Sequence, residues 1–233
     1  MLKFISKEQV WAAMDKGHHT TLGWEPVQYH LKTWQDVVVF DRIAGSQGKT
    51  VGETGGGRSR ILKALSARND CYNVDKFAGQ HGGPKGEYTL PGVTNIVAFL
   101  GDFSPDLPSS FFDIVFSVSV VEHVPDAGAQ AFMDDLVRAL KPGALSIHAI
   151  DMYIGAGPLA GSQKRLDLYR SWLERPDIEP LGPVTAEKAV FAPWMASNPD
   201  QTMWQWNRSV PQLREMRSKT QSASLLLGFR KKT

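Results

Sequence analysis

Residues 49–59 read KTVGETGGGRS. The pattern predicts a short strand at 49–53 that ends in a glycine turn, followed by a helix at 59–68 with Ser59 near its start. Glycines at such a turn let the backbone approach a ligand closely, because no Cβ intervenes. The helix N-terminus adds free N–H groups and a positive partial charge, which suit a carboxylate or a phosphate. Taken alone, the cluster fits either a ligand site or a plain tight turn.

The chain around this turn alternates between predicted strands and helices. Further strands are expected at 71–75, 93–100, 112–118, 144–150 and 224–230. Between 129 and 140 the spacing becomes helical, with Phe132, Leu136 and Leu140 recurring every four residues. Such dense apolar strands are typical of a parallel sheet covered on both faces, and their alternation with helices implies right-handed crossovers. We therefore predict an α/β fold with a doubly wound, mostly parallel sheet and helices on both faces.

Two less regular regions are interpreted as an α-rich or irregular cap over one edge of the sheet. Residues 1 to about 35 are predicted to be helical. The region 152–209 is rich in Pro, Trp and Gly, with one helix expected near 162–173. We predict a single domain, 1–233, with a core at about 36–151 and 210–233 and the cap elements at about 1–35 and 152–209.

Three acidic residues are expected at the ligand-binding edge of this sheet, beyond the carboxyl ends of successive strands. Glu53 directly precedes the glycines, where it can accept a hydrogen bond from a cationic amino group or an ordered water. Asp75 ends the second strand, a position from which an acid can bind both hydroxyls of a ribose. Asp102 follows the third strand, where its carboxylate can meet an exocyclic amine. Their joint arrival at one edge indicates a nucleoside-containing ligand with a cationic amino group.

Four segments, taken in order, resemble motifs of the class I S-adenosylmethionine-dependent methyltransferases. Residues 51–57 look like the first motif, and 101–103 resemble the adenine-binding motif. Residues 112–124, FDIVFSVSVVEHV, are very similar to the fourth-strand motif and are the most specific stretch. Residues 136–145 resemble the helix and turn before the fifth strand. The resemblance covers roughly 49–151 and implies a Rossmann-like fold with S-adenosylmethionine as the cofactor.

The resemblance also implies roles for individual residues. Glu53 would lie near the amino group of the cofactor, and Gly55 and Gly57 against its methionine and ribose parts. Asp75 would bind the ribose hydroxyls. The whole cofactor-binding set implied in this way is Glu53, Gly55, Gly57, Asp75, Lys76, Asp102, Phe103, Ser117 and Val118.

The resemblance also predicts which residues contact the adenine and the methionine ends of the cofactor. Asp102 would meet the adenine amine, and Phe103 would contribute its backbone N–H and its ring. Ser117 and Val118 would face the methionine end, near the sulfonium. One departure from the family lies at 77–86, where so many Gly and Pro residues follow the second strand that the usual helix is not expected.

The chemistry predicted from this resemblance is an in-line methyl transfer. The enzyme must align a nucleophile with the methyl group and, for a hydroxyl, remove its proton. His123, just beyond the fourth strand, and Asp151, read as the end of the fifth, are the two candidate bases. A structural role for His123 remains the alternative, and His148, within the fifth strand, is expected to lie in the core.

The acceptor is expected to be a small molecule, such as a sugar or a secondary metabolite, methylated on oxygen. No Asn/Asp-Pro-Pro-Tyr motif follows the fourth strand, which argues against a class that methylates bases or amides. Cys71, the single cysteine, is too far from the later strands to serve a cytosine C5 enzyme. The tryptophans of the expected cap either line an acceptor pocket or bury the cap: Trp172, Trp194, Trp204 and Trp206.

The net charge, the cysteine count and the length of the apolar runs exclude several classes of protein. The net charge of +2 argues against a nucleic-acid partner, and one cysteine excludes a disulfide framework or a cysteine-rich metal site. No metal is predicted. No signal peptide and no run of about 18 apolar residues is found, so we expect no membrane partner and a cytoplasmic location. A monomer or a homodimer is expected.

Two rival functions remain open at this stage. An NAD(P)-dependent oxidoreductase would also use a glycine turn, but would not need Glu53 or the Glu122-His123 pair. A catalytically inactive methyltransferase-like binding protein would keep the fold without the reaction.

Overall fold

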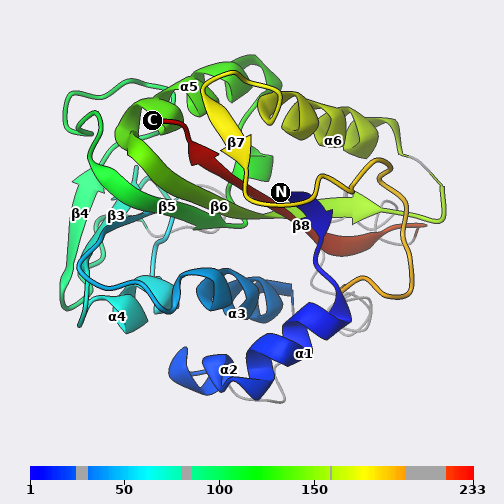
Figure 1. The fold of residues 1–233 in the computed structure, drawn as a ribbon, viewed down its shortest axis with the longest axis horizontal. Helices are drawn as coiled ribbons and strands as arrows, with labels where there is room; N and C mark the ends of the chain where they lie inside the picture. Colours follow the sequence, from blue (N-terminus) through cyan, green and yellow to red (C-terminus); the bar gives the residue numbers. More distant parts are fainter. Residues whose placement is uncertain (25–30, 80–84, 158, 198–218) are drawn as a thin grey trace.

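One central sheet organises the chain in the computed structural model, which describes residues 1–24, 31–79, 85–157, 159–197 and 219–233. The strands lie in the order β1-β8-β6-β5-β2-β3-β4, and β7 pairs with β8 (Figure 1). Their bounds are β1 Leu2–Phe4, β2 Thr50–Thr54, β3 Asp70–Asp75, β4 Val93–Val97, β5 Phe112–Val118, β6 Leu140–Ile154, β7 Ile178–Pro180 and β8 Gln221–Lys231.

The middle of the sheet is parallel, and one side of it is antiparallel. Strands β4, β3, β2, β5 and β6 run parallel to one another, whereas β8 runs antiparallel to β6, β1 and β7. This arrangement confirms the predicted doubly wound, mostly parallel α/β fold.

Helices cover both faces of the sheet. In Figure 1, α5 and α6 lie on one side of it, and α1, α3 and α4 lie on the other. Each side has its own apolar core, the first around Phe132 and Trp172, the second around Val38 and Leu62. The helices are α1 Lys7–Asp15, α2 His18–Thr21, α3 Leu31–Ile43, α4 Arg60–Leu65, α5 Ala129–Ala139 and α6 Ala160–Trp172, with short 3-10 turns η2 Val121–His123 and η3 Asp126–Gly128.

The prediction that residues 1–35 are helical is wrong at the first strand. Leu2–Phe4 forms β1, which pairs Leu2 with Leu227 at the edge of the sheet. Leu2 and Phe4 join the core on one face, and Met1 and Ile5 join the core on the other. This alternation is the period of a strand buried on both faces, and it outweighs helix propensity in so short a segment.

Some strand limits also differ from expectation. β4 ends at Val97 rather than at Leu100, so the following residues belong to a loop. β6 begins at Leu140, and its register against β5 shifts between Phe112 and Ile114. Because β6 continues to Ile154, Asp151 lies inside the strand and does not end it.

No helix of the described residues is long and apolar enough to cross a membrane.

Candidate functional site

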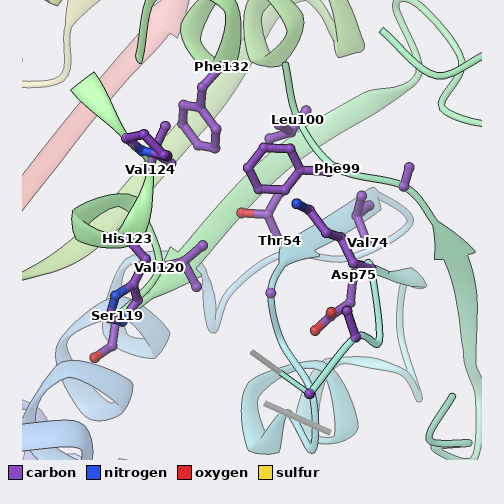
Figure 2. A pocket seen from close by; sticks show the side chains of 16 residues that line it. Thr54, Val74, Asp75, Phe99, Leu100, Ser119, Val120, His123, Val124 and Phe132 are labelled. Atoms are coloured by element: carbon purple, nitrogen blue, oxygen red, sulfur yellow. The ribbon is translucent and has the colours of Figure 1, made fainter. Parts of the chain in front are cut away.

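A cavity of about 330 Å³ opens at the carboxyl ends of the parallel strands. Figure 2 shows Thr54, Asp75 and Phe99 on one side of it, with Val120 and His123 opposite. These side chains come from the ends of β2 and β3, the loop after β4 and the loop after β5. The cavity therefore occupies the edge at which open α/β sheets bind ligands.

The glycine turn forms the floor of this cavity at the end of β2. Gly55 and Gly57 have φ angles of +65° and +50°, which glycine adopts readily. A Cβ on Gly55 would lie 2.7 Å from Cγ2 of Val120, so the close approach of the two segments requires glycine. The Asn73 side chain donates a hydrogen bond to the Gly57 carbonyl at 3.1 Å, and Ser59 caps α4 by accepting one from the Leu62 N–H.

Buried oxygens without partners surround this turn. Glu53 is only 3% exposed. Its Oε2 atom, Asn73 Oδ1 and Thr54 Oγ1 are buried and make no hydrogen bond with the described residues. Buried polar atoms are normally satisfied, so this cluster fits a ligand that brings hydrogen-bond donors. A cationic amino group is such a donor, and the residues present fit S-adenosylmethionine on this ground.

Burial also changes the charge of Glu53. Removal from water raises the pKa of this carboxyl to about 7, while the nearby Lys32 ammonium opposes the rise. A bound cation would favour the ionised carboxylate and lower the pKa again. The site is thus poised to couple cofactor binding to the release of a proton near neutral pH.

Glu53→Gln is expected to remove a pH-dependent loss of stability. The pKa of Glu53 is raised in the folded state, so the folded state binds the proton more tightly than the unfolded chain does. The wild type should therefore lose stability as pH rises from about 4.5 to about 7, by roughly 3 kcal/mol from this group. Urea unfolding of the apoprotein at pH 5 and pH 8 measures the loss, which should be smaller in the variant. Equal losses in both proteins would contradict the assignment.

Asp75 and Lys76 both line the cavity at the end of β3. Asp75 Oδ1 accepts a hydrogen bond from the Phe77 N–H at 2.8 Å, which fixes the carboxylate at the rim. The Lys76 ammonium lies 3.7 Å from the centre of the Phe99 ring, a cation–π contact. Phe99 thereby forms one wall of the cavity.

Asp102 and Phe103, predicted to contact adenine, do not line the cavity. Asp135 of α5 is fully buried, and its Oδ2 accepts hydrogen bonds from the Gly101 and Phe103 N–H groups at 2.8 and 3.1 Å. These bonds tie the turn to α5 and occupy the Phe103 N–H. The Phe103 ring is 49% exposed.

Ser117 and Val118, predicted to face the methionine end, are buried inside β5. The Ser117 hydroxyl lies 2.7 Å from Nδ1 of His148. The next two residues along the chain, Ser119 and Val120, line the cavity in their place. β5 ends at Val118 as predicted, and both Ser117 and Val118 are buried in the strand, so the first residues to reach the cavity are the two that follow it.

The candidate bases occupy different positions. His123 lines the cavity, and its Nε2 lies 4.0 Å from Oε1 of Glu122. Asp151 does not line the cavity; its Oδ1 accepts a hydrogen bond from Gln35 and lies 3.1 Å from the Ser119 hydroxyl oxygen. His148 is in the core as predicted, and burial lowers its pKa to about 3, so it stays neutral.

Several carboxylates gather beside the His123 side of the cavity. Burial and the nearby Asp151 hold the pKa of Glu122 well above its ordinary value, and neither Glu122 oxygen makes a well-formed hydrogen bond with the described residues. Asp36 is buried on α3 and pairs with Lys32 at 3.4 Å. Lys32 also lowers the pKa of both Glu53 and Glu122. The Lys32 ammonium thus lies near three acids: Asp36, Glu53 and Glu122.

Among the residues at the site that the sequence did not indicate are Gln35, Asn73, Phe99, Ser119 and Phe132. Two of them carry a recognisable signal. Asn73 is a polar residue in the middle of an apolar strand, and Gln35 with Asp36 interrupts the apolar face of a helix. Such positions are buried only when the side chain has a partner. The positions of Phe99, Ser119 and Phe132 at the cavity depend on tertiary contacts, which the sequence pattern does not predict.

The tryptophans of the predicted cap have different environments. Trp172 is 2% exposed and stacks on Phe132, so it belongs to the core, whereas Trp194 is 52% exposed. Trp204 and Trp206 lie outside the described residues. No group of three or more His, Cys, Asp or Glu side chains in the described ranges could hold a metal ion.

Comparisons with known proteins agree with this geometry. A family model described as a methyltransferase domain matches residues 52–147, which span β2 to β6 and include the cavity floor. No curated protein matches the chain in sequence.

Solved structures show the same fold at low identity. A candidate sarcosine dimethylglycine methyltransferase from Galdieria sulphuraria is similar over 94% of this chain and 98% of its own, with 13% identity and a TM-score of 0.56. The 4+2 cyclase SpnF is similar over 99% of both chains, with 13% identity and a TM-score of 0.55. Phosphoethanolamine N-methyltransferase 2 of Haemonchus contortus, in complex with S-adenosylhomocysteine, matches 96% of this chain but 58% of its own, with 13% identity and a TM-score of 0.54.

Proposed function

We propose that the chain is a class I S-adenosylmethionine-dependent methyltransferase that methylates a hydroxyl oxygen of a small molecule; the match of residues 52–147 to a methyltransferase domain supports this proposal. S-adenosylmethionine supplies the methyl group, in an in-line displacement at its sulfonium. The chain's own residues must bind this cofactor, align the acceptor and take up the acceptor's proton.

The glycine turn and the ends of β2 and β3 are proposed to hold the cofactor. Glu53 has an unpartnered buried oxygen suited to an amino group, and Gly55 leaves room at the cavity floor. Asp75 presents a carboxylate at the rim, where ribose hydroxyls would be bound, and Lys76 stands beside it. Glu53 and Gly57 lie next to the cavity lining but are not part of it. Asp102, Phe103, Ser117 and Val118 have the weakest support for this role, because they neither line the cavity nor belong to the glycine turn.

His123 carries the proposal for an oxygen acceptor. Its imidazole lines the same cavity as Gly55 and Val120. A hydroxyl loses its proton as the new C–O bond forms, and a neutral imidazole can accept that proton. Asp151, the other candidate base, is less suited because its Oδ1 already accepts a hydrogen bond from Gln35 and the residue does not line the cavity.

A cationic amine is the second candidate acceptor, and a specific observation favours it. The Lys32 ammonium pairs with Asp36 and lies near Glu122, which also lies near Asp151 and precedes His123 in the chain. A positive group placed among these buried acids would favour their ionised forms. An amine acceptor would supply that charge and would release its proton to one of these acids before methylation.

Transfer of a labelled methyl group to matched acceptors tests the proposal. The purified chain is incubated with S-adenosylmethionine labelled in the methyl group and with paired hydroxyl and amino compounds of the same carbon skeleton. We expect label in the hydroxyl members of the pairs. Label confined to the amines would replace the oxygen assignment by the nitrogen one, and no label in either set would favour a binding protein without activity.

A further inference from the structure

Ser119, directly after β5, has a backbone conformation that is costly for any residue except glycine. Its φ angle is +56°, in the left-handed region. Strained residues of this kind persist only where the surrounding structure holds them in place. Both Ser119 and its neighbour Val120 line the cavity, so this conformation shapes the wall that faces the glycine turn.

Three contacts hold Ser119 in this conformation. Its hydroxyl donates to Gln35 Oε1 at 2.8 Å and lies 3.1 Å from Asp151 Oδ1. Its backbone N–H donates to the Ala149 carbonyl of β6 at 2.9 Å. The Gln35 side chain donates in turn to Asp151 Oδ1, which closes a ring of three side chains.

The ring joins three separate parts of the fold. Gln35 comes from α3 and is fully buried, Ser119 follows β5, and Asp151 lies within β6. A fully buried amide that is satisfied by two partners has little freedom to move. The ring can therefore fix the end of β5 against both α3 and the sheet.

Fixing Ser119 also fixes the fit between Val120 and the glycine turn. Val120 Cγ2 would be 2.7 Å from a Cβ at position 55, so Val120 packs directly on Gly55. A small rotation of the Ser119 backbone would move Val120 into or away from the floor of the cavity. The wall opposite the cofactor turn depends on this one residue.

We propose that Gln35 and Asp151 are positioning residues, which hold Ser119 in its left-handed conformation and so set the wall that faces Gly55. The proposal rests on the proposed function and its cofactor site. It gives Asp151 a role other than that of a base, because its Oδ1 is engaged by Gln35 and Ser119. The ring requires an oxygen atom at position 151 that accepts a hydrogen bond. It does not require a negative charge there.

Two substitutions of Ser119 separate the effect of the strained backbone from the effect of the lost hydroxyl. Ser119→Ala loses the hydrogen bonds and keeps the cost of a positive φ, whereas Ser119→Gly loses the same bonds but adopts this φ freely. We expect Ser119→Ala to weaken S-adenosylhomocysteine binding about tenfold and Ser119→Gly by less than about threefold, measured by calorimetric titration. Equal weakening in the two variants would overturn the proposal.

Asp151 gives the second test, through a conservative variant. Asp151→Asn keeps an oxygen acceptor for both hydrogen bonds and removes the charge, so kcat and the dissociation constant of S-adenosylhomocysteine should stay within about threefold of wild type. Asp151→Leu removes the acceptor and should weaken binding about as much as Ser119→Ala does. A loss of about 100-fold in kcat for Asp151→Asn, with binding intact, would make Asp151 a base instead.

Thermal unfolding of the apoproteins keeps this test independent of the cofactor assignment. Ser119→Gly should unfold at a higher temperature than Ser119→Ala, because only alanine retains the backbone strain. Failure of the wild type to bind S-adenosylhomocysteine would count against the proposed function alone. An unfolding temperature of Ser119→Gly at or below that of Ser119→Ala would count against the positioning role.

Discussion

His123→Ala is expected to lower kcat for a hydroxyl acceptor by about 100-fold or more, with the affinity for S-adenosylhomocysteine changed by less than about threefold. General base catalysis contributes on the order of 10²–10⁴ in rate. His123 lines the cavity beside Val120 and Val124, whereas the buried acid Glu53 lies at the glycine turn. Loss of the imidazole therefore removes a proton acceptor while the proposed cofactor contacts remain. Steady-state kinetics with the acceptor found in the labelling experiment measures kcat, and calorimetric titration measures the affinity.

Two comparison variants sharpen this result. His123→Gln keeps a polar side chain of similar reach without a basic nitrogen, and should be as slow as His123→Ala. His18→Ala removes a histidine that pairs with Asp41 at 3.0 Å and does not line the cavity, so its kcat should match wild type. Activity of His123→Ala within a few-fold of wild type would mean that positioning alone drives the reaction and that His123 has a structural role.

Gly55→Ala is expected to weaken S-adenosylhomocysteine binding by about 100-fold. The new methyl group would lie 2.7 Å from Val120 Cγ2, and the residue has a φ angle of +65°. Overpacking of this kind costs roughly 1–3 kcal/mol, and here Val120 can yield only by moving the opposite wall of the cavity. The loss should appear in calorimetric titration as a raised dissociation constant.

Gly48→Ala is the matched control for the backbone cost. Gly48 has a φ angle of +61°, close to that of Gly55, and a Cβ there would meet nothing within 4 Å. Both variants should lose similar stability from the left-handed backbone, roughly 1 kcal/mol, while only Gly55→Ala loses affinity. If Gly48→Ala weakened binding as much, the effect would come from general destabilisation and not from the cavity floor.

The order of strands and helices was predictable because the apolar residues of most elements recur with a clear period. Dense apolar runs such as 112–118 are required by burial on both faces, and they marked the parallel strands correctly. The Leu2–Phe4 strand escaped prediction because it is short and stands at the edge, where only pairing with β8 defines it. Pairing between the first and last segments of a chain has no local signature in the sequence.

Part of the candidate site followed from the motifs, and the rest depended on tertiary contacts. Gly55, Asp75, Lys76 and His123 were predicted and line the cavity. The first three end or directly follow a strand with a clear pattern, and His123 lies in the turn η2 shortly after β5. Phe103 was placed in the site by its motif, but the buried Asp135 of α5 engages its N–H group. A contact between residues 32 positions apart cannot be read from the motif itself.

The ring of Gln35, Ser119 and Asp151 also could not be predicted from the sequence. Ser119 was not singled out, since a serine at the end of a strand is ordinary in sequence. Its importance comes from a left-handed φ angle and from Gln35, which is 84 residues away. Long-range hydrogen bonds of this kind decide the shape of the cavity wall and are visible only in the folded structure.

Calorimetric titration of the wild-type chain with S-adenosylhomocysteine and, separately, with NADH tests the central claim most directly. The unpartnered oxygen of Glu53 and the close packing of Val120 on Gly55 fit a cofactor with a cationic amino group, and a pyrophosphate would meet a carboxylate there. We predict saturable heat with S-adenosylhomocysteine at about one site per chain and none with NADH. Saturable heat with NADH and none with S-adenosylhomocysteine would contradict the account.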